Sequence, residues 1–428
     1  MLNSDLPSNN FSNKSDGFSL KVKVSRLILA WELPFSSLLL ALLFYSIFAR
    51  IRGPITSTSI FPYYNYLADA FLHGQLHLRL LPPTTHDLVY FNQRYYLYWP
   101  PLPAILFMPL VLIFGVNFSD ILVTVVLGSV NVGLVALLLR QACAKGIIRI
   151  SRMQRAWMVL FFALGTVHIT LAPHGRVWFT AQVIAFGFTI LAFLIPIAMK
   201  GWIAFFLSGV AVASAMLTRN HLIFIGIWPA FYLLYTHRKF GIPRLYKYSL
   251  VGISIPILAL IGFLAYNWVR FGDIFDVGLY HHQMDHFFQD DFSKYGAFDV
   301  AYIPKNLFYQ YINYPFPFRM DSVMGGSLFL LSPVFFAAFQ GIIKGRPRIS
   351  MAFLVLTILA VSIPILLLMG TGWVQFGPRY TLDFTVPLLL LTAKGIRRWR
   401  NSILAILTMI SIIQYIGGYL YLIKLGVI

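Results

Sequence analysis

The chain has 428 residues, of which 59% are hydrophobic and only 11% are charged. Soluble domains carry about 25% charged residues, so water cannot be the main solvent of this protein. Its formal charge of +19 does not indicate nucleic-acid binding, because the Lys and Arg residues lie in short clusters between apolar runs. That pattern is typical of membrane orientation signals. We therefore expect an integral membrane protein with the lipid bilayer as its surroundings and no nucleic-acid partner.

No long polar stretch separates two sets of apolar runs, so we expect one membrane domain over residues 1–428. Residues 1–26 are polar and include four basic side chains, and they are expected to form a cytoplasmic tail. The apolar run after them is too long for a signal-peptide core and lacks an obvious cleavage site, so it should remain as the first membrane helix. The single cysteine, Cys143, cannot form an internal disulfide and is expected to be a packing residue.

A helix needs about 20 apolar residues to cross a bilayer core. Runs that meet or nearly meet this length predict an all-α bundle of about 11 transmembrane helices. They cover residues 27–49, 118–140, 156–173, 179–199, 202–218, 221–236, 248–268, 326–343, 350–369, 380–393 and 402–423. The short runs 202–218 and 221–236 could instead form one bent hairpin.

The distribution of charge predicts the orientation. With the N-terminus in the cytoplasm, 21 of the 33 Lys and Arg residues fall on the cytoplasmic side of the predicted helices. All acidic residues except Asp5, Asp16 and Glu32 lie in or beside the segments predicted on the opposite side of the membrane. Because cytoplasmic loops hold the excess of positive charge, we expect a multi-pass protein of the cell membrane with its N-terminus inside.

Two long segments lie on the predicted outer side. The first, residues 50–117, contains a Tyr-rich stretch that continues into an apolar, charge-interrupted one, and then the run Leu102 to Phe114. That run is too short to span comfortably and contains prolines, so we expect helices lying in the membrane interface. The second segment, residues 270–325, is the most polar part of the chain. Chemistry is expected where these two loops meet.

The first loop holds two candidate general bases, Asp69 and Asp87. Helical spacing puts Asp69 and His73 one turn apart on the same face, a rigid setting for a carboxylate that takes a proton from a hydroxyl group. Asp87 precedes Arg94 and Tyr95, which could place it in a site. The alternatives are an ordinary polar face of an interfacial helix for Asp69 and a turn for Asp87. Asp69 is the preferred base.

Four arginines stand at the predicted outer ends of helices: Arg176, Arg219, Arg270 and Arg379, the last followed by Tyr380. A guanidinium keeps its charge and forks well onto phosphate oxygens, so these residues are candidate substrate ligands. Each could equally extend to the interface with no functional role. The cluster from His281 to His286 completes no known ligand spacing, so we expect neither a metal nor another cofactor.

The order of these parts resembles the GT-C superfamily of membrane glycosyltransferases, especially bacterial relatives of protein O-mannosyltransferases and of the lipid A aminoarabinose transferase (glycosyltransferase family 39-like). The motifs that carry the resemblance are Tyr64 to Gly74, Tyr98-Trp99-Pro100-Pro101-Leu102-Pro103, Phe114-Gly115, Leu217-Thr218-Arg219-Asn220 and Gly377-Pro378-Arg379-Tyr380. The resemblance implies sugar transfer from a polyprenyl-phosphate donor to an envelope acceptor at the outer face. It implies a first-loop aspartate as base and basic groups that hold the leaving phosphate.

The chain departs from the family pattern just before Tyr64. The family places an acidic pair about four residues before the matching Tyr, and here that stretch reads Ser59-Ile60-Phe61-Pro62. Either Asp69 or Asp87 takes over the role, or the fold is kept without the chemistry. A transporter or lipid flippase and a non-catalytic envelope-assembly scaffold are the competing hypotheses. A flippase is disfavoured because the polar residues gather at one face and not near the midplane.

Overall fold

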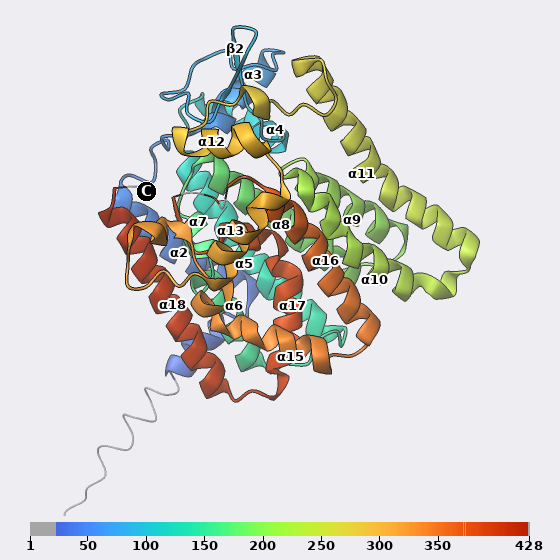
Figure 1. Cartoon of the computed structure of the whole chain (residues 1–428). Coiled ribbons are helices and arrows are strands. Elements are labelled where there is room, and N and C mark those ends of the chain that lie inside the picture. Colours follow the sequence, from blue (N-terminus) through green and yellow to red (C-terminus); the bar gives the residue numbers. More distant parts are fainter. Residues whose placement is uncertain (1–22, 371, 373, 427–428) are drawn as a thin grey trace, which may run out of the picture.

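A computed structural model describes residues 23–370, 372 and 374–426, and within them the chain is a bundle of helices with four very short strands (Figure 1). Six helices are long and apolar enough to cross a membrane. They are α2 (Pro34–Arg52), α5 (Asp120–Ala144), α8 (Val177–Ala198), α11 (Ile242–Phe271), α16 (Arg348–Leu367) and α18 (Asn401–Lys424).

The remaining elements of the bundle are shorter. They are α6 (Arg152–Leu164), α7 (His168–Leu171), α9 (Gly201–Met216), the 3-10 helix η1 (Asn220–Gly226), α10 (Ile227–His237), η2 (Arg238–Phe240), α14 (Leu328–Leu331), η7 (Pro333–Phe336), α15 (Ala337–Lys344), η8 (Arg379–Phe384), α17 (Thr385–Gly395) and η9 (Ile396–Arg398).

Each of the eleven predicted spans contains helix, but six of them are short or divided between elements. The predicted span 156–173 is split into α6 and α7, and 326–343 is split where Ser332 precedes Pro333. Residues 202–218 and 221–236 form separate elements, α9 and then η1 with α10. The polytopic all-α class is confirmed, while the number of crossings stays a prediction.

The first predicted helix, 27–49, is not continuous. Residues 23–30 are helical, a turn follows at residues 31–33, and α2 starts at Pro34. Proline lacks the backbone N–H that a helix interior needs and clashes with the preceding turn, so it suits the first helical position. The helix therefore breaks just before Pro34, because proline favours the first position of a new helix. Hydropathy alone did not predict this break.

The centre of the bundle is α8, which packs between α5 and α9. In its most apolar stretch 72% of residues are buried, against 6% for α11. Helix α11 packs mainly on α9 and lies at the edge of the bundle (Figure 1). Its contact with α9 is close because Gly209 of α9 and Gly252 of α11 lack side chains: a Cβ on Gly209 would meet the carbonyl oxygen of Gly252.

We expect Gly209→Ala to destabilise the protein by about 1–3 kcal/mol, because the added methyl group has no room against a backbone carbonyl. Thermal unfolding in detergent micelles measures this. The matched control is Gly262→Ala on α11, where none of the described residues packs within 4 Å of the added carbon. An unchanged midpoint for Gly209→Ala would show that α11 does not pack on α9 in this way.

The two long loops lie at the same end of the bundle, which we call the large-loop end (Figure 1). The first loop contains α3 (Tyr63–Leu72), the antiparallel hairpin β1 (Val89–Phe91) and β2 (Arg94–Tyr96), and α4 (Leu102–Phe114). The second contains η3 (Leu279–His281), α12 (His286–Tyr295), η4 (Val300–Tyr302), α13 (Ile303–Leu307), the π-helix η5 (Phe308–Ile312), η6 (Met320–Val323) and β3 (Met324–Gly325), which pairs with β4 (Gln375–Phe376).

The helices predicted in the first loop are confirmed as α3 and α4, which pack on each other. The hairpin between them was not predicted, since its two turn residues, Asn92 and Gln93, include no glycine although both have positive φ. The two loops are joined directly: the backbone N–H of Asp87 donates to the carbonyl of Gln283, and that of Gln283 donates to the carbonyl of Leu88.

Candidate active site

A cavity of about 880 Å³ opens at the large-loop end. Its walls come from both loops and from the ends of α8, α9, α16 and the start of η8. Its polar and aromatic lining includes His86, Asp87, Tyr98, Trp99, Arg176, Trp178, Thr218, Arg219, Asn220, His221, His282, Asp285, Arg379 and Tyr380. Segments more than 290 residues apart in the chain thus contribute to one site.

Asp87 is the first-loop carboxylate that lines the cavity. It has a positive φ of 63°, a conformation that Asp adopts more readily than most residues. The indole N–H of Trp178 donates to its Oδ2 at 3.0 Å. Trp178 belongs to the first turn of α8, so the central helix of the bundle fixes the direction of this carboxylate.

His282 of the second loop lies on the other oxygen of Asp87. Its Nε2 is 3.0 Å from Asp87 Oδ1, an ion-pair distance if the ring is protonated, although the ring is not aligned for a hydrogen bond. His86 Nε2 lies 3.6 Å from the same oxygen, and its Nδ1 lies 3.8 Å from Asp285. Asp87 therefore sits among histidines at the junction of the two loops.

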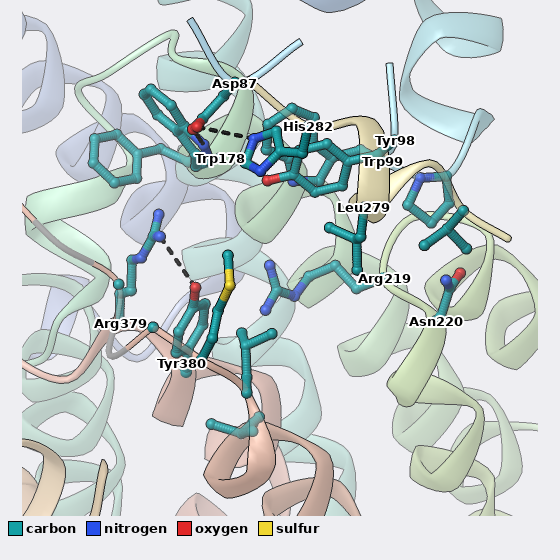
Figure 2. A pocket seen from close by; sticks show the side chains of 18 of the residues that line it. Asp87, Tyr98, Trp99, Trp178, Arg219, Asn220, Leu279, His282, Arg379 and Tyr380 are labelled. Carbon is teal, nitrogen blue, oxygen red and sulfur yellow. Dashed lines mark hydrogen bonds and ion pairs between the residues drawn. The ribbon is translucent and has the colours of Figure 1, made fainter. Parts of the chain in front are cut away.

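Basic groups occupy the facing side of the cavity. Figure 2 shows Asp87, His282 and Trp178 on one side and Arg379, Tyr380 and Arg219 on the other. The guanidinium of Arg379 donates to the hydroxyl of Tyr380 at 3.2 Å. Within the described part of the chain, no carboxylate lies at ion-pair distance from Arg379, and its buried Nε has no hydrogen-bond partner. Arg379 can therefore accept an anionic ligand.

Arg219 differs from Arg379 because a carboxylate already pairs with it. Its Nε and Nη2 lie 3.1 and 2.9 Å from Asp383 Oδ2. Its guanidinium also lies over the ring of Tyr380, 5.3 Å from the centroid, while Arg379 lies 4.9 Å from the same centroid. Tyr380 thus separates the two cations, and only one of them has its charge balanced by Asp383.

Arg176 is the third cavity arginine. It precedes the first residue of α8 and lies 5.6 Å from the centroid of Phe61. Burial, together with nearby Arg52, lowers the pKa of Arg176 to about 10. It still carries its charge at neutral pH, so the cavity contains a second buried cation besides Arg379.

The rest of the cavity is apolar. Its lining there includes Phe224, Phe275, Phe288, Phe298, Pro364, Ile365, Leu368 and Met369. The last four belong to the C-terminal end of α16 and the residues after it, so this wall adjoins a predicted membrane-spanning helix. The cavity is therefore amphipathic, with a charged part and a hydrocarbon-like part.

Asp69, the preferred base from the sequence, is not among the residues that line the cavity. Both of its oxygens accept from Arg79 at 3.0 Å. His73 lies one turn away as predicted, but its Nδ1 contacts the backbone oxygen of Asp69 at 2.8 Å and lies 3.7 Å from the carboxylate. Arg79 neutralises the carboxylate of Asp69, so this ion pair gives Asp69 a structural role that requires no catalytic function.

Three more candidate ligands lie outside the cavity lining. Arg94 and Tyr95 belong to β2, where Tyr95 packs on Tyr90 across the hairpin. Arg270 is buried and donates to the carbonyl of Leu97 at 2.7 Å and to Asn267. It therefore connects the end of α11 to the first loop.

The histidine cluster of the second loop diverges. His281 packs against Phe91, His282 faces Asp87, and His286 contacts Gln289. In the described residues, no group of three or more His, Cys, Asp or Glu side chains is arranged to hold a metal ion.

Sequence reasoning missed Asp383 and His221 as members of this site. Asp383 is a lone carboxylate inside the apolar run 380–393. Ionisable residues within such runs are costly and usually functional, so its position was an available signal. His221 gave no signal of its own, because a single histidine beside an arginine is common at helix ends.

The fold and the cavity define a polytopic membrane protein whose site suits an amphipathic substrate with an anionic head. No protein-family model and no curated protein matches the sequence. Several solved structures do, among them the following two. The oligosaccharyltransferase of Archaeoglobus fulgidus in its apo form matches with a TM-score of 0.50 and 13% identity, over 90% of this chain and 55% of that one.

The second is the structure of ArnT from Cupriavidus metallidurans bound to undecaprenyl phosphate, with a TM-score of 0.48, 13% identity, and coverage of 90% of this chain and 61% of that one. The chain thus spans a little over half the length of these proteins. At this identity the match to the oligosaccharyltransferase concerns the fold alone. The chain therefore shares the fold of that membrane oligosaccharyltransferase, in agreement with the fold that the motifs predicted.

Proposed function

We propose that this protein is a glycosyltransferase that moves a sugar from a polyprenyl-phosphate donor to a hydroxyl group of an envelope acceptor at the outer face of the cell membrane. The observation that carries the proposal is the cavity in which Asp87 faces Arg379, with Arg176 also in the lining. A carboxylate suits proton removal, and guanidinium groups suit a phosphate leaving group. The fold that the chain shares with an oligosaccharyltransferase supports sugar transfer.

In the proposed reaction, the acceptor oxygen forms a bond to the anomeric carbon of the sugar. The bond from that carbon to the phosphate oxygen breaks, and the phosphate leaves with the electron pair. The acceptor proton passes to the carboxylate of Asp87. Arg379 and Arg176 stabilise the charge that grows on the phosphate, while the apolar wall accommodates the polyprenyl chain.

The test uses the full chain in lipid vesicles. Undecaprenyl phosphate is expected to bind more tightly than undecaprenol, which lacks the phosphate. Radiolabelled undecaprenyl-phosphate sugars, incubated with envelope extract, are expected to lose label to an acceptor. Equal binding of the two lipids, with no transfer of any label, would reject the proposal. Transfer of intact lipid across the vesicle membrane would instead support a flippase.

The proposed outer-face site requires the N-terminus to be cytoplasmic. We expect a reporter fused after Lys145 or Arg398 to lie in the cytoplasm and a reporter inserted near Asp290 to lie outside the cell. The loops that contain Lys145 and Arg398 hold the excess of basic residues, which is typical of cytoplasmic loops. Alkaline phosphatase and fluorescent protein fusions in whole cells measure this. The opposite reading at these positions would put the cavity on the cytoplasmic side.

A further inference from the structure

The stretch Thr218-Arg219-Asn220-His221 joins α9 to η1, and all four of its residues line the cavity. It is a polar strip that adjoins apolar side chains such as Phe224 and Leu368. Arg219 and His221 both contact the same buried oxygen, Oδ2 of Asp383. The carboxylate thus fixes two cavity side chains at once.

The contact with Asp383 determines which nitrogen of His221 carries a hydrogen. Nε2 of His221 lies 2.8 Å from the carboxylate oxygen, which can only accept, so Nε2 must be protonated. Arg219 already supplies one positive charge to that carboxylate. A neutral imidazole satisfies the contact, whereas a second cation would leave the buried group with a net positive charge.

In the neutral ring, Nδ1 carries a lone pair and acts as a hydrogen-bond acceptor. Asp383 is the one hydrogen-bond partner of the His221 ring among the described residues. The His221 side chain is 18% exposed and lines the cavity. The acceptor is therefore available to a ligand that brings an O–H or N–H group.

We propose that His221, fixed by Asp383, binds a hydroxyl group of the donor sugar through Nδ1. This inference rests on the proposed function and adds the residue that distinguishes a sugar-bearing lipid phosphate from the lipid phosphate alone. Arg219 lies beside His221 on the same carboxylate and offers donors to the oxygens of the same sugar. A sugar hydroxyl both donates and accepts, so it matches this pair.

The test compares dissociation constants for the full chain in lipid nanodiscs. The probes are undecaprenol, undecaprenyl phosphate, and undecaprenyl phosphate carrying mannose, glucose, galactose or arabinose. Tryptophan fluorescence reports binding, since Trp99 and Trp178 line the cavity. In the wild-type protein, at least one sugar-bearing lipid is expected to bind about three- to tenfold more tightly than undecaprenyl phosphate, the range for one hydrogen bond.

His221→Phe is expected to abolish this preference and to leave the affinity for undecaprenyl phosphate unchanged, because phenylalanine has no acceptor nitrogen. His221→Asn, whose side chain is too short to reach both partners, serves if the first variant fails to fold, and the same loss is expected. His286→Asn is the matched control. His286 is an exposed histidine of the second loop outside the cavity lining, so the preference should persist.

Three results would overturn the inference. The variants could retain the preference, the wild-type protein could show none, or the variants could weaken binding of undecaprenyl phosphate as much as that of the sugar-bearing lipids. The third result would identify His221 as a phosphate ligand. If the wild-type protein binds undecaprenyl phosphate no better than undecaprenol, the proposed function itself fails, and the inference fails with it.

Discussion

Asp87→Asn is expected to reduce sugar transfer by about 10²–10⁴-fold, the contribution of a positioned general base. Asparagine keeps the size of the side chain and can still accept from the Trp178 indole, so the local structure should survive. It cannot take a proton from the acceptor hydroxyl. Initial rates of transfer in membrane vesicles, at matched protein amounts, measure the effect.

The same assay decides between Asp87 and Asp69. Asp69→Asn removes the partner of Arg79 and is expected to lower the thermal stability of the first loop with a smaller effect on transfer. Asp290→Asn, at an exposed position on α12, is the control for loss of a carboxylate at this end of the bundle. Full activity of Asp87→Asn together with an inactive Asp69→Asn would restore Asp69 as the base.

Arg379→Gln is expected to weaken binding of undecaprenyl phosphate by about 10- to 100-fold. Hydrogen bonds between charged partners are worth roughly twice as much as neutral ones, and Arg379 has no carboxylate partner among the described residues to balance its charge. The hydroxyl of Tyr380 can still bind the glutamine side chain, which limits rearrangement. Binding to the full chain in nanodiscs measures the loss.

Lys294→Gln provides the charge-matched control, because Lys294 lies on exposed α12 outside the cavity lining. It should leave the affinity unchanged at moderate salt concentration, because salt screens the interactions of a solvent-exposed charge. Equal losses for Arg379→Gln and Lys294→Gln would point to a general effect of net charge. The phosphate would then have to lie elsewhere.

Local patterns of the sequence determined the class of the protein and much of its layout. The apolar runs predicted a polytopic helical bundle, because crossing a bilayer requires about 20 apolar residues in succession and this property is local. The first-loop helices α3 and α4 were also predictable from their own residues. The GT-C resemblance rested on short motifs, and the fold agrees with it.

Tertiary structure decided which charged residues share a site. The sequence indicated both Asp69 and Asp87 as first-loop bases and favoured Asp69, yet Asp69 pairs with Arg79 while Asp87 lines the cavity. Arg270 and Arg379 both stand near helix ends, yet Arg270 donates to the carbonyl of Leu97 in the first loop and to Asn267 of its own helix, whereas Arg379 lines the cavity. Whether each of these residues lines the cavity depends on the residue that pairs with it or on the path of the loop around it. Hydropathy encodes neither property.

The pairing of His221 with Asp383 shows the same limit for two residues that are far apart in the chain. The two residues are 162 positions apart, near the start of η1 and the end of η8, and they meet because the bundle brings these two segments together. The sequence indicated only that Asp383 was a carboxylate in a costly position within an apolar run, and it gave no signal for His221. Only the packing of the helices decided that a buried carboxylate would fix the histidine that lines the cavity.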